Sequence, residues 1–301
     1  RDSDRTIRRH PSPLPPCKFH RRHWLRQMVR AFADGVKCLT RHGFHDEPCA
    51  MDDATQNGGT KIAYRHAVAR AVLVRFLQAS LPLLALALFL ADLLTPSRPG
   101  MVTLIVIVLH GAATGIAGYG LWSAYPHDRL GRANLVTQLR AAMAVSLSAG
   151  LVHPFADHAA WMAVTIATVS LLLDGVDGWL ARRDGLVSSF GARYDMEVDS
   201  FLALMLALVA WRSAGWGAEV LLLGLPRYGF MLAAALLPFL RGPLPHSVRR
   251  KACCVLQIAA LIVLIVPLPI GEVAGGLALL AGGCLYASFA VDIVHLWCRR
   301  A

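Results

Sequence analysis

Long, predominantly apolar runs dominate the sequence from about residue 72 onward. Eight of them have roughly the 17–25 residues that a helix needs to cross the hydrocarbon core of a bilayer. They lie at 72–94, 101–122, 134–153, 158–182, 194–214, 218–240, 252–268 and 273–297. In lipid, the backbone polar groups must be paired within the protein, and only helices or closed barrels achieve this. The pattern therefore predicts an all-α fold, a polytopic membrane helical bundle.

The composition excludes an ordinary soluble domain. Hydrophobic residues make up 56% of the chain and charged residues only 16%, against about 45–50% and about 25% in soluble globular proteins. The net charge is +11, but the basic residues lie beside the apolar runs rather than on one soluble face. Membrane lipids with anionic headgroups and an anionic substrate are therefore the predicted partners, and nucleic acid is not.

The basic residues of the loops also predict the topology. The loops at 123–134, 182–193, 241–251 and 298–301 hold eleven Lys and Arg residues, whereas the intervening loops hold two. Loops rich in Lys and Arg stay in the cytoplasm. With eight spans, both termini then lie on the cytoplasmic side. We expect an integral protein of the bacterial inner membrane.

The N-terminal segment differs from the rest of the chain. Residues 1–70 are basic, are rich in Pro near their start, and contain no membrane-length apolar run. Met51 is a possible natural start, because the chain does not begin with Met. The composition predicts a largely disordered extension at 1–70.

Four aspartates cluster at the cytoplasmic ends of two successive spans. Asp174 and Asp177 are three residues apart on the first span, and Asp195 and Asp199 are four apart on the second. Each pair shares one helix face, and a short loop lets the pairs face each other. Ionisable groups at the centre of a membrane helix cost about 2.5–3.5 kcal/mol each, and converging carboxylates repel. The spacing therefore predicts a site for Mg²⁺ or Mn²⁺, which prefer oxygen ligands.

The residues around the second aspartate fit a phosphate-containing substrate. Gly178 leaves room for a ligand close to the helix backbone, and Ala181 is small on the next turn. Arg182 offers a forked donor to phosphate. Two divalent ions on a pyrophosphate would neutralise its developing charge, while a spare carboxylate would take the proton of an acceptor hydroxyl.

This stretch resembles the signature of the CDP-alcohol phosphatidyltransferase family, DxxDGxxAR, about eight residues, then GxxxDxxxD. Every fixed position is present: Asp174, Asp177, Gly178, Ala181, Arg182, Gly191, Asp195 and Asp199. The resemblance implies a six-helix catalytic core over 124–301, preceded by two additional transmembrane helices at 71–123. It also implies a homodimer.

The resemblance assigns roles to these residues. Asp174, Asp177 and Asp195 would be metal ligands, and Asp199 would be the catalytic base, also close to a metal. The residues that would bind the CDP-alcohol are Gly178, Ala181, Arg182 and Gly191. Asn134, Thr137 and Arg140 also look like the family's Asn-x-x-Thr-x-x-Arg motif on the first core helix, which faces the same site, and by this resemblance they would also bind the CDP-alcohol. Such polar residues equally suit hydrogen bonds between helices.

The implied activity is transfer of a phosphatidyl group from CDP-diacylglycerol to a small alcohol acceptor, with release of CMP, in phospholipid biosynthesis. A CDP-choline or CDP-ethanolamine phosphotransferase that acts on diacylglycerol is the alternative within the family. A membrane cation transporter and a catalytically inactive relative are alternatives outside this activity.

The acceptor stays open. Members that use glycerol phosphate tend to carry Gly-Lys before the third aspartate and then Asp-Pro-x-Ala-Asp-Lys, which begins with that aspartate. This chain lacks both lysines and the proline. Arg193 and Arg227 are the candidate acceptor-binding groups, although Arg227 suits an internal pair with Glu197 equally well. The basic run 249–251 is a further candidate acceptor group, although a role as a determinant of topology is the favoured interpretation.

Overall fold

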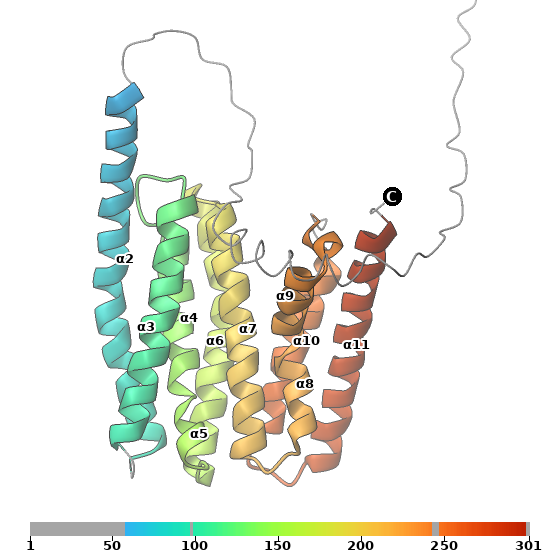
Figure 1. Ribbon diagram of the computed structural model, residues 1–301. Helices are drawn as coiled ribbons and strands as arrows, with labels where there is room; N and C mark the ends of the chain where they lie inside the picture. Colours follow the sequence, from blue (N-terminus) through green and yellow to red (C-terminus); the bar gives the residue numbers. More distant parts are fainter. Residues whose placement is uncertain (1–57, 97–98, 243–246, 299–301) are drawn as a thin grey trace, which may run out of the picture.

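The computed structural model describes residues 58–96, 99–242 and 247–298, and this part of the chain is helical throughout, with no strand. The helices, drawn in Figure 1, are α2 (Gly58–Leu94), α3 (Pro99–Ala124), α4 (Arg132–Ser146), α5 (Ala149–Val152), α6 (Asp157–Asp184), α7 (Ser189–Arg212), the 3-10 turn η1 (Ala218–Val220), α8 (Leu221–Gly224), α9 (Pro226–Leu236), the 3-10 turn η2 (Pro238–Arg241), α10 (Val248–Leu264) and α11 (Gly271–Cys298). The predicted all-α helical bundle is confirmed.

The predicted N-terminal extension ends earlier than residue 70. Met51 and the rest of residues 1–57 lie outside the described residues, but α2 already begins at Gly58. Residues 58–70 are therefore helical. The hydropathy pattern located only the apolar part of this helix, because Ala, Lys and Arg favour a helix without making it apolar.

The helices of the described residues pass through the bundle eight times, but not every pass is an apolar span. Five helical segments of the described chain are long and apolar enough to cross a membrane, and α8 with α9 forms a sixth if the bent pair counts as one. The exceptions are α7 and α10. The first half of α7 carries three acidic residues, Asp195, Glu197 and Asp199, and α10 has 17 residues, the shortest length that crosses a bilayer. Two of the acidic residues that make α7 polar, Asp195 and Asp199, form the second aspartate pair.

The predicted span at 218–240 is bent rather than straight. Its two helices, α8 and α9, meet at an angle of 66°. Pro226 is the first residue of α9, where its missing N–H costs nothing. Before the bend, α8 lies very close to α7, since a Cβ on Gly224 would lie 2.8 Å from the Cβ of Ala207. Only glycine permits that approach.

Helix α4 is the centre of the bundle. In the segment Arg132–Val152, which comprises α4 and α5, about 72% of the most apolar stretch is buried inside the bundle, against 33% or less in the other long apolar helices. Helix α4 contacts α2, α6 and α7. Its middle is built from Ala141, Ala142 and Ala144, which are all buried and whose small side chains let neighbouring helices approach closely. Polar groups on α4 are therefore shielded from lipid.

The two N-terminal helices are packed onto this centre. Phe76 of α2 is fully buried and meets Tyr194 of α7 edge to face, with ring centroids 6.1 Å apart. The side chain of Gln138 on α4 donates a hydrogen bond of 3.3 Å to the backbone oxygen of Phe76. Helix α2 thus reaches α7 one residue before Asp195.

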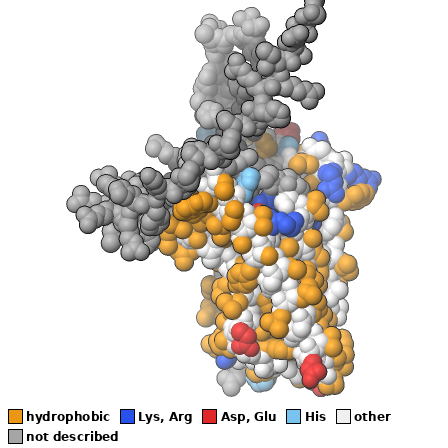
Figure 2. Space-filling view, turned by 90° about the vertical axis from the view of Figure 1, so that its right-hand side faces the viewer, with side chains coloured by type: hydrophobic (Ala, Val, Ile, Leu, Met, Phe, Trp, Pro, Cys, Tyr) orange, Lys and Arg blue, Asp and Glu red, His pale blue; other side chains and the backbone are white. Residues whose placement is uncertain are grey.

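The outer faces of the bundle are apolar. Leu81, Ile116 and Leu279, on α2, α3 and α11, are 67%, 75% and 80% exposed. In Figure 2, hydrophobic side chains spread over the middle of one flank, while Lys and Arg gather toward its upper end. The same upper end of Figure 1 holds the connections from α3 to α4, from α6 to α7 and from α9 to α10. This distribution is that of an integral membrane protein.

Candidate active site

A tight turn brings the two aspartate pairs together. Helix α6 ends at Gly185, whose left-handed φ of 65° turns the chain away from the helix axis. Ser188 then caps α7, because its hydroxyl accepts a hydrogen bond of 3.0 Å from the backbone N–H of Gly191. The last turns of α6 consequently lie beside the first turns of α7, as the sequence predicted.

Three of the four aspartates form a compact oxygen cluster. One carboxylate oxygen from each of Asp174, Asp177 and Asp195 lies within 4.8 Å of the others. Asp174 and Asp177 are buried, whereas the side chain of Asp195 is 31% exposed. Asp199 lies one turn further along α7 and is outside this trio. The trio is therefore closed to solvent on its α6 side and accessible on its α7 side.

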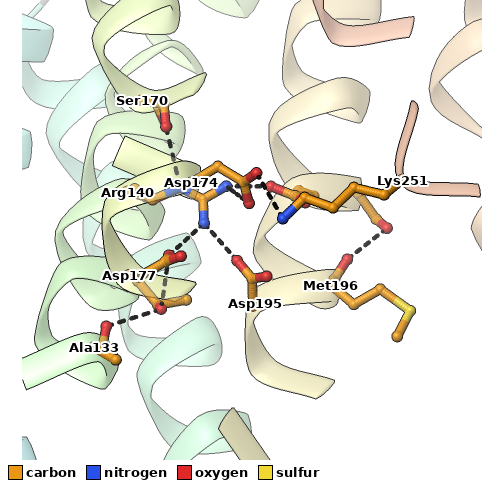
Figure 3. A network of polar contacts seen from close by, with 11 residues as sticks. Ala133, Arg140, Ser170, Asp174, Asp177, Asp195, Met196 and Lys251 are labelled. Carbon is orange, nitrogen blue, oxygen red and sulfur yellow. Dashed lines mark hydrogen bonds and ion pairs between the residues drawn. The ribbon is translucent and has the colours of Figure 1, made fainter. Parts of the chain in front are cut away.

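The guanidinium of Arg140 lies in the middle of the four carboxylates. Its Nη1 is 2.7 Å from Oδ2 of Asp177 and 2.5 Å from Oδ1 of Asp195. Its Nη2 is paired with Asp199 and lies 3.3 Å from Oδ1 of Asp174. Figure 3 shows the side chain entering the cluster from α4. The sequence motif placed Arg140 near the site but did not predict these ion pairs.

A second cation approaches from the opposite side. Lys251, at the start of α10, places Nζ 3.5 Å from Oδ2 of Asp174, and its side chain is 64% exposed. From the sequence, the basic run that contains Lys251 was either an acceptor-binding group or a determinant of topology, and no local pattern shows that α10 lies next to α6. The neighbouring Arg249 instead pairs with Asp292 on α11, at 2.6 Å.

Two further residues of the α4 motif lie close to the site, one beside Asp177 and the other beside the start of α7. Thr137 is buried, and its hydroxyl contacts Oδ2 of Asp177 at 3.2 Å and the backbone oxygen of Ala133 at 3.0 Å. Asn134 is also buried, and its Oδ1 would lie 3.3 Å from a Cβ on Gly191. Gly191 therefore lets the start of α7 pack closely against α4.

The residues after Asp177 are more open. A Cβ on Gly178 would meet only Nη1 of Arg182, at 3.5 Å. Arg182 is exposed, and Ala181 is partly buried. These three residues thus border the open side of the last turn of α6, where a ligand can approach the helix backbone.

The two candidate acceptor groups are placed differently. Arg227 on α9 pairs with Glu197, with Nε 3.5 Å from Oε2 and Nη2 in contact with Oε1. This is the internal pair that the sequence had left open as an alternative. Arg193 is exposed on the first turns of α7. Glu197 is two residues from both Asp195 and Asp199, so it points to a different face of α7.

The donor set fits a hard divalent cation. All of the candidate ligand atoms are carboxylate oxygens, the ligands that Mg²⁺ and Mn²⁺ prefer. Oδ1 of Asp174 is buried and makes no hydrogen bond, and buried polar atoms normally have a partner. Asp174, Asp177 and Asp195 are therefore the residues that would hold the ion.

One comparison with known proteins gives a match. The family model described as CDP-alcohol phosphatidyltransferase matches residues 130–293. This range contains both aspartate pairs and runs from just before α4 into α11, so that α2 and α3 lie outside it. No curated protein and no solved structure matches the chain. The resemblance inferred from the sequence is thereby confirmed.

Proposed function

Because the chain belongs to the CDP-alcohol phosphatidyltransferase family, we propose that it transfers the phosphatidyl group of CDP-diacylglycerol to the hydroxyl of a small alcohol. The acceptor oxygen bonds to the β-phosphorus, and the bond from that phosphorus to the oxygen of CMP breaks. CMP leaves with the bridging oxygen, and the product is a phosphodiester lipid. The observation that carries the proposal is the carboxylate cluster that the four motif aspartates form at one end of the bundle.

The charge balance of the site supports a pyrophosphate substrate. Four carboxylates with Arg140 and Lys251 leave a formal charge of −2. Two divalent ions would change this to +2, and the two negative charges of a CDP-alcohol pyrophosphate would neutralise it. Bound Mg²⁺ or Mn²⁺ supplies Lewis acidity that stabilises the charge on the leaving phosphate.

Asp199 is the residue we assign as general base. It shares a helix face with Asp195 but lies outside the trio, so it stays available to the acceptor hydroxyl. Its side chain is 21% exposed, and its Oδ1 is held by Arg140. Arg140 thus orients the carboxylate, while the second oxygen accepts the proton.

A diacylglycerol-bearing donor suits the position of the site. The aspartates lie on the last turns of α6 and the first turns of α7, at one end of an apolar bundle. The same turns carry exposed Trp179 and Met196, so acyl chains can lie against the flank while the nucleotide stays in water. The basic loops at this end favour a cytoplasmic orientation, in a bacterial inner membrane.

The test is a matrix of donors and acceptors with purified, folded protein. CMP release is measured in Mg²⁺ or Mn²⁺ for CDP-diacylglycerol, CDP-choline and CDP-ethanolamine, and the lipid products are identified by mass spectrometry. Asp177→Asn is expected to lose turnover, whereas the matched Asp184→Asn, on the same helix but paired with Arg132, keeps it. If folded protein releases no CMP with any pair, the proposal fails.

A further inference from the structure

Arg140 is the most completely enclosed charged residue of the site. Its side chain is fully buried, whereas that of Lys251, the other cation beside the aspartates, is 64% exposed. Arginine cannot lose its proton inside a protein, so its charge has to be compensated where it lies. Because the buried charge needs anionic partners at all times, the guanidinium stays among the carboxylates of the site.

The guanidinium donates most of its hydrogen bonds to the aspartates and the main chain of the site. Nε donates to the backbone oxygen of Ser170 at 3.1 Å. Nη1 donates to Asp177 and Asp195, and Nη2 donates to Asp199 and lies 3.3 Å from Asp174. A guanidinium has five N–H groups, and four of them donate these hydrogen bonds, while Asp174 adds an ion pair. These contacts are all with the protein, whereas the resemblance implies that Arg140 helps to bind the CDP-alcohol.

The same contacts keep the four carboxylates together. Without a cation between them, like charges a few ångströms apart repel and would drive the aspartates apart or to protonation. Arg140 comes from α4, the most buried of the long helices, so the main chain that carries it is held on several sides. One buried arginine therefore ties α6 and α7 to α4 through their aspartates.

We propose that Arg140 is a built-in cation that holds the aspartate site in its converged form before divalent ions bind, and that it shares the carboxylate oxygens with those ions. It is a positioning residue. The proposal rests on the proposed function only in that the ions are those of the transfer reaction. By linkage, a group that competes with the ions for their ligands weakens their binding, and its removal strengthens it.

The test compares Arg140→Met with the wild type by thermal unfolding in EDTA and by Mn²⁺ titration in detergent. We expect a lower Tm in EDTA, a larger rise in Tm with Mn²⁺, and Mn²⁺ binding that is tighter by about tenfold. Arg132→Met is the matched control on the same helix, since Arg132 pairs with Asp184 outside the cluster, and it should keep the wild-type Mn²⁺ affinity. Arg140→Lys, which keeps the charge but not the forked donors, should lie between Arg140→Met and the wild type.

An unchanged Tm in EDTA together with equal or weaker Mn²⁺ binding in Arg140→Met would overturn the proposal. If Arg140→Met does not fold in EDTA, the double variant Arg140→Met/Asp199→Asn, which removes one charge of each sign, is expected to recover folded protein. Failure of that recovery would also overturn it. Neither measurement needs a nucleotide or turnover, so the result is independent of the CMP-release test.

Discussion

Substitution of Asp199 by Asn separates the general base from the metal ligands. Asn has nearly the same shape, so α7 and its packing are retained. The trio Asp174, Asp177 and Asp195 does not include the altered side chain. The change therefore removes the proton acceptor and one of the four ion pairs of Arg140, and leaves the compact oxygen cluster in place.

The expected loss follows from the role of a general base. Such a group contributes about 10²–10⁴-fold to a rate, which corresponds to about 3–5 kcal/mol of transition-state stabilisation. We expect the CMP-release kcat of Asp199→Asn to fall by about this factor. The Mn²⁺ affinity, measured by titration in the absence of nucleotide, should stay within about threefold of the wild type, because the trio is intact.

Glu197→Gln is the matched control for this prediction. Glu197 lies two residues away on the same helix and pairs with Arg227 instead of with the cluster. It should retain CMP release within about threefold, as expected for a partly exposed pair. Turnover above about a third of the wild type in Asp199→Asn would refute the assignment of the base. A loss of Mn²⁺ binding in parallel with turnover would show that Asp199 acts as a ligand.

The remaining predictions concern packing and one hydrogen bond. Gly224→Ala should lower the free energy of unfolding by about 1–3 kcal/mol, because its Cβ would meet α7 at 2.8 Å; Gly229→Ala, where nothing lies within 4 Å, is the control in thermal unfolding. Thr137→Val removes the hydroxyl that contacts Asp177 and should weaken Mn²⁺ binding by about fivefold, for a hydrogen bond of about 1 kcal/mol; an unchanged affinity contradicts this. Phe76→Ala, at a fully buried position, should cost about 3–5 kcal/mol of stability, and wild-type stability would show that the N-terminal helices are not needed by the core.

The sequence predicted the aspartate pairs well because their placement is local. Residues three or four apart on a helix share a face whatever surrounds the helix, so Asp174 with Asp177 could be placed without the fold. The turn at Gly185 is also a local signal, since glycine favours the left-handed conformation that ends a helix. These features required no knowledge of which helices are neighbours.

The ion pairs of the site could not be predicted, because they depend on helix packing. Lys251 is far from Asp174 in the chain and reaches it only because α10 lies beside α6. The motif indicated that Arg140 faces the site, but hydropathy and spacing say nothing of a guanidinium among four carboxylates. For Arg227, the sequence left open a role in acceptor binding and an internal ion pair with Glu197. The fold places Arg227 of α9 beside Glu197 of α7, which produces the ion pair.

The positions of the helices along the chain were predicted better than their polarity, length and bending. Apolar runs located α7 and α10, but α7 carries three acidic residues, and α10, with 17 residues, has only the shortest length that crosses a bilayer. The buried aspartates of α6 and the guanidinium of Arg140 give the aspartates of α7 polar neighbours. The bend before Pro226 was likewise invisible to hydropathy.

The proposed site is tested most directly by anomalous diffraction from crystals grown with Mn²⁺ and a CDP-alcohol. We predict manganese density within coordinating distance of Asp174, Asp177 and Asp195, with the pyrophosphate against the ion and the guanidinium of Arg140 still beside the carboxylates. Manganese density elsewhere in the protein, or a pyrophosphate bound away from these aspartates, would contradict the proposed site and the chemistry assigned to it.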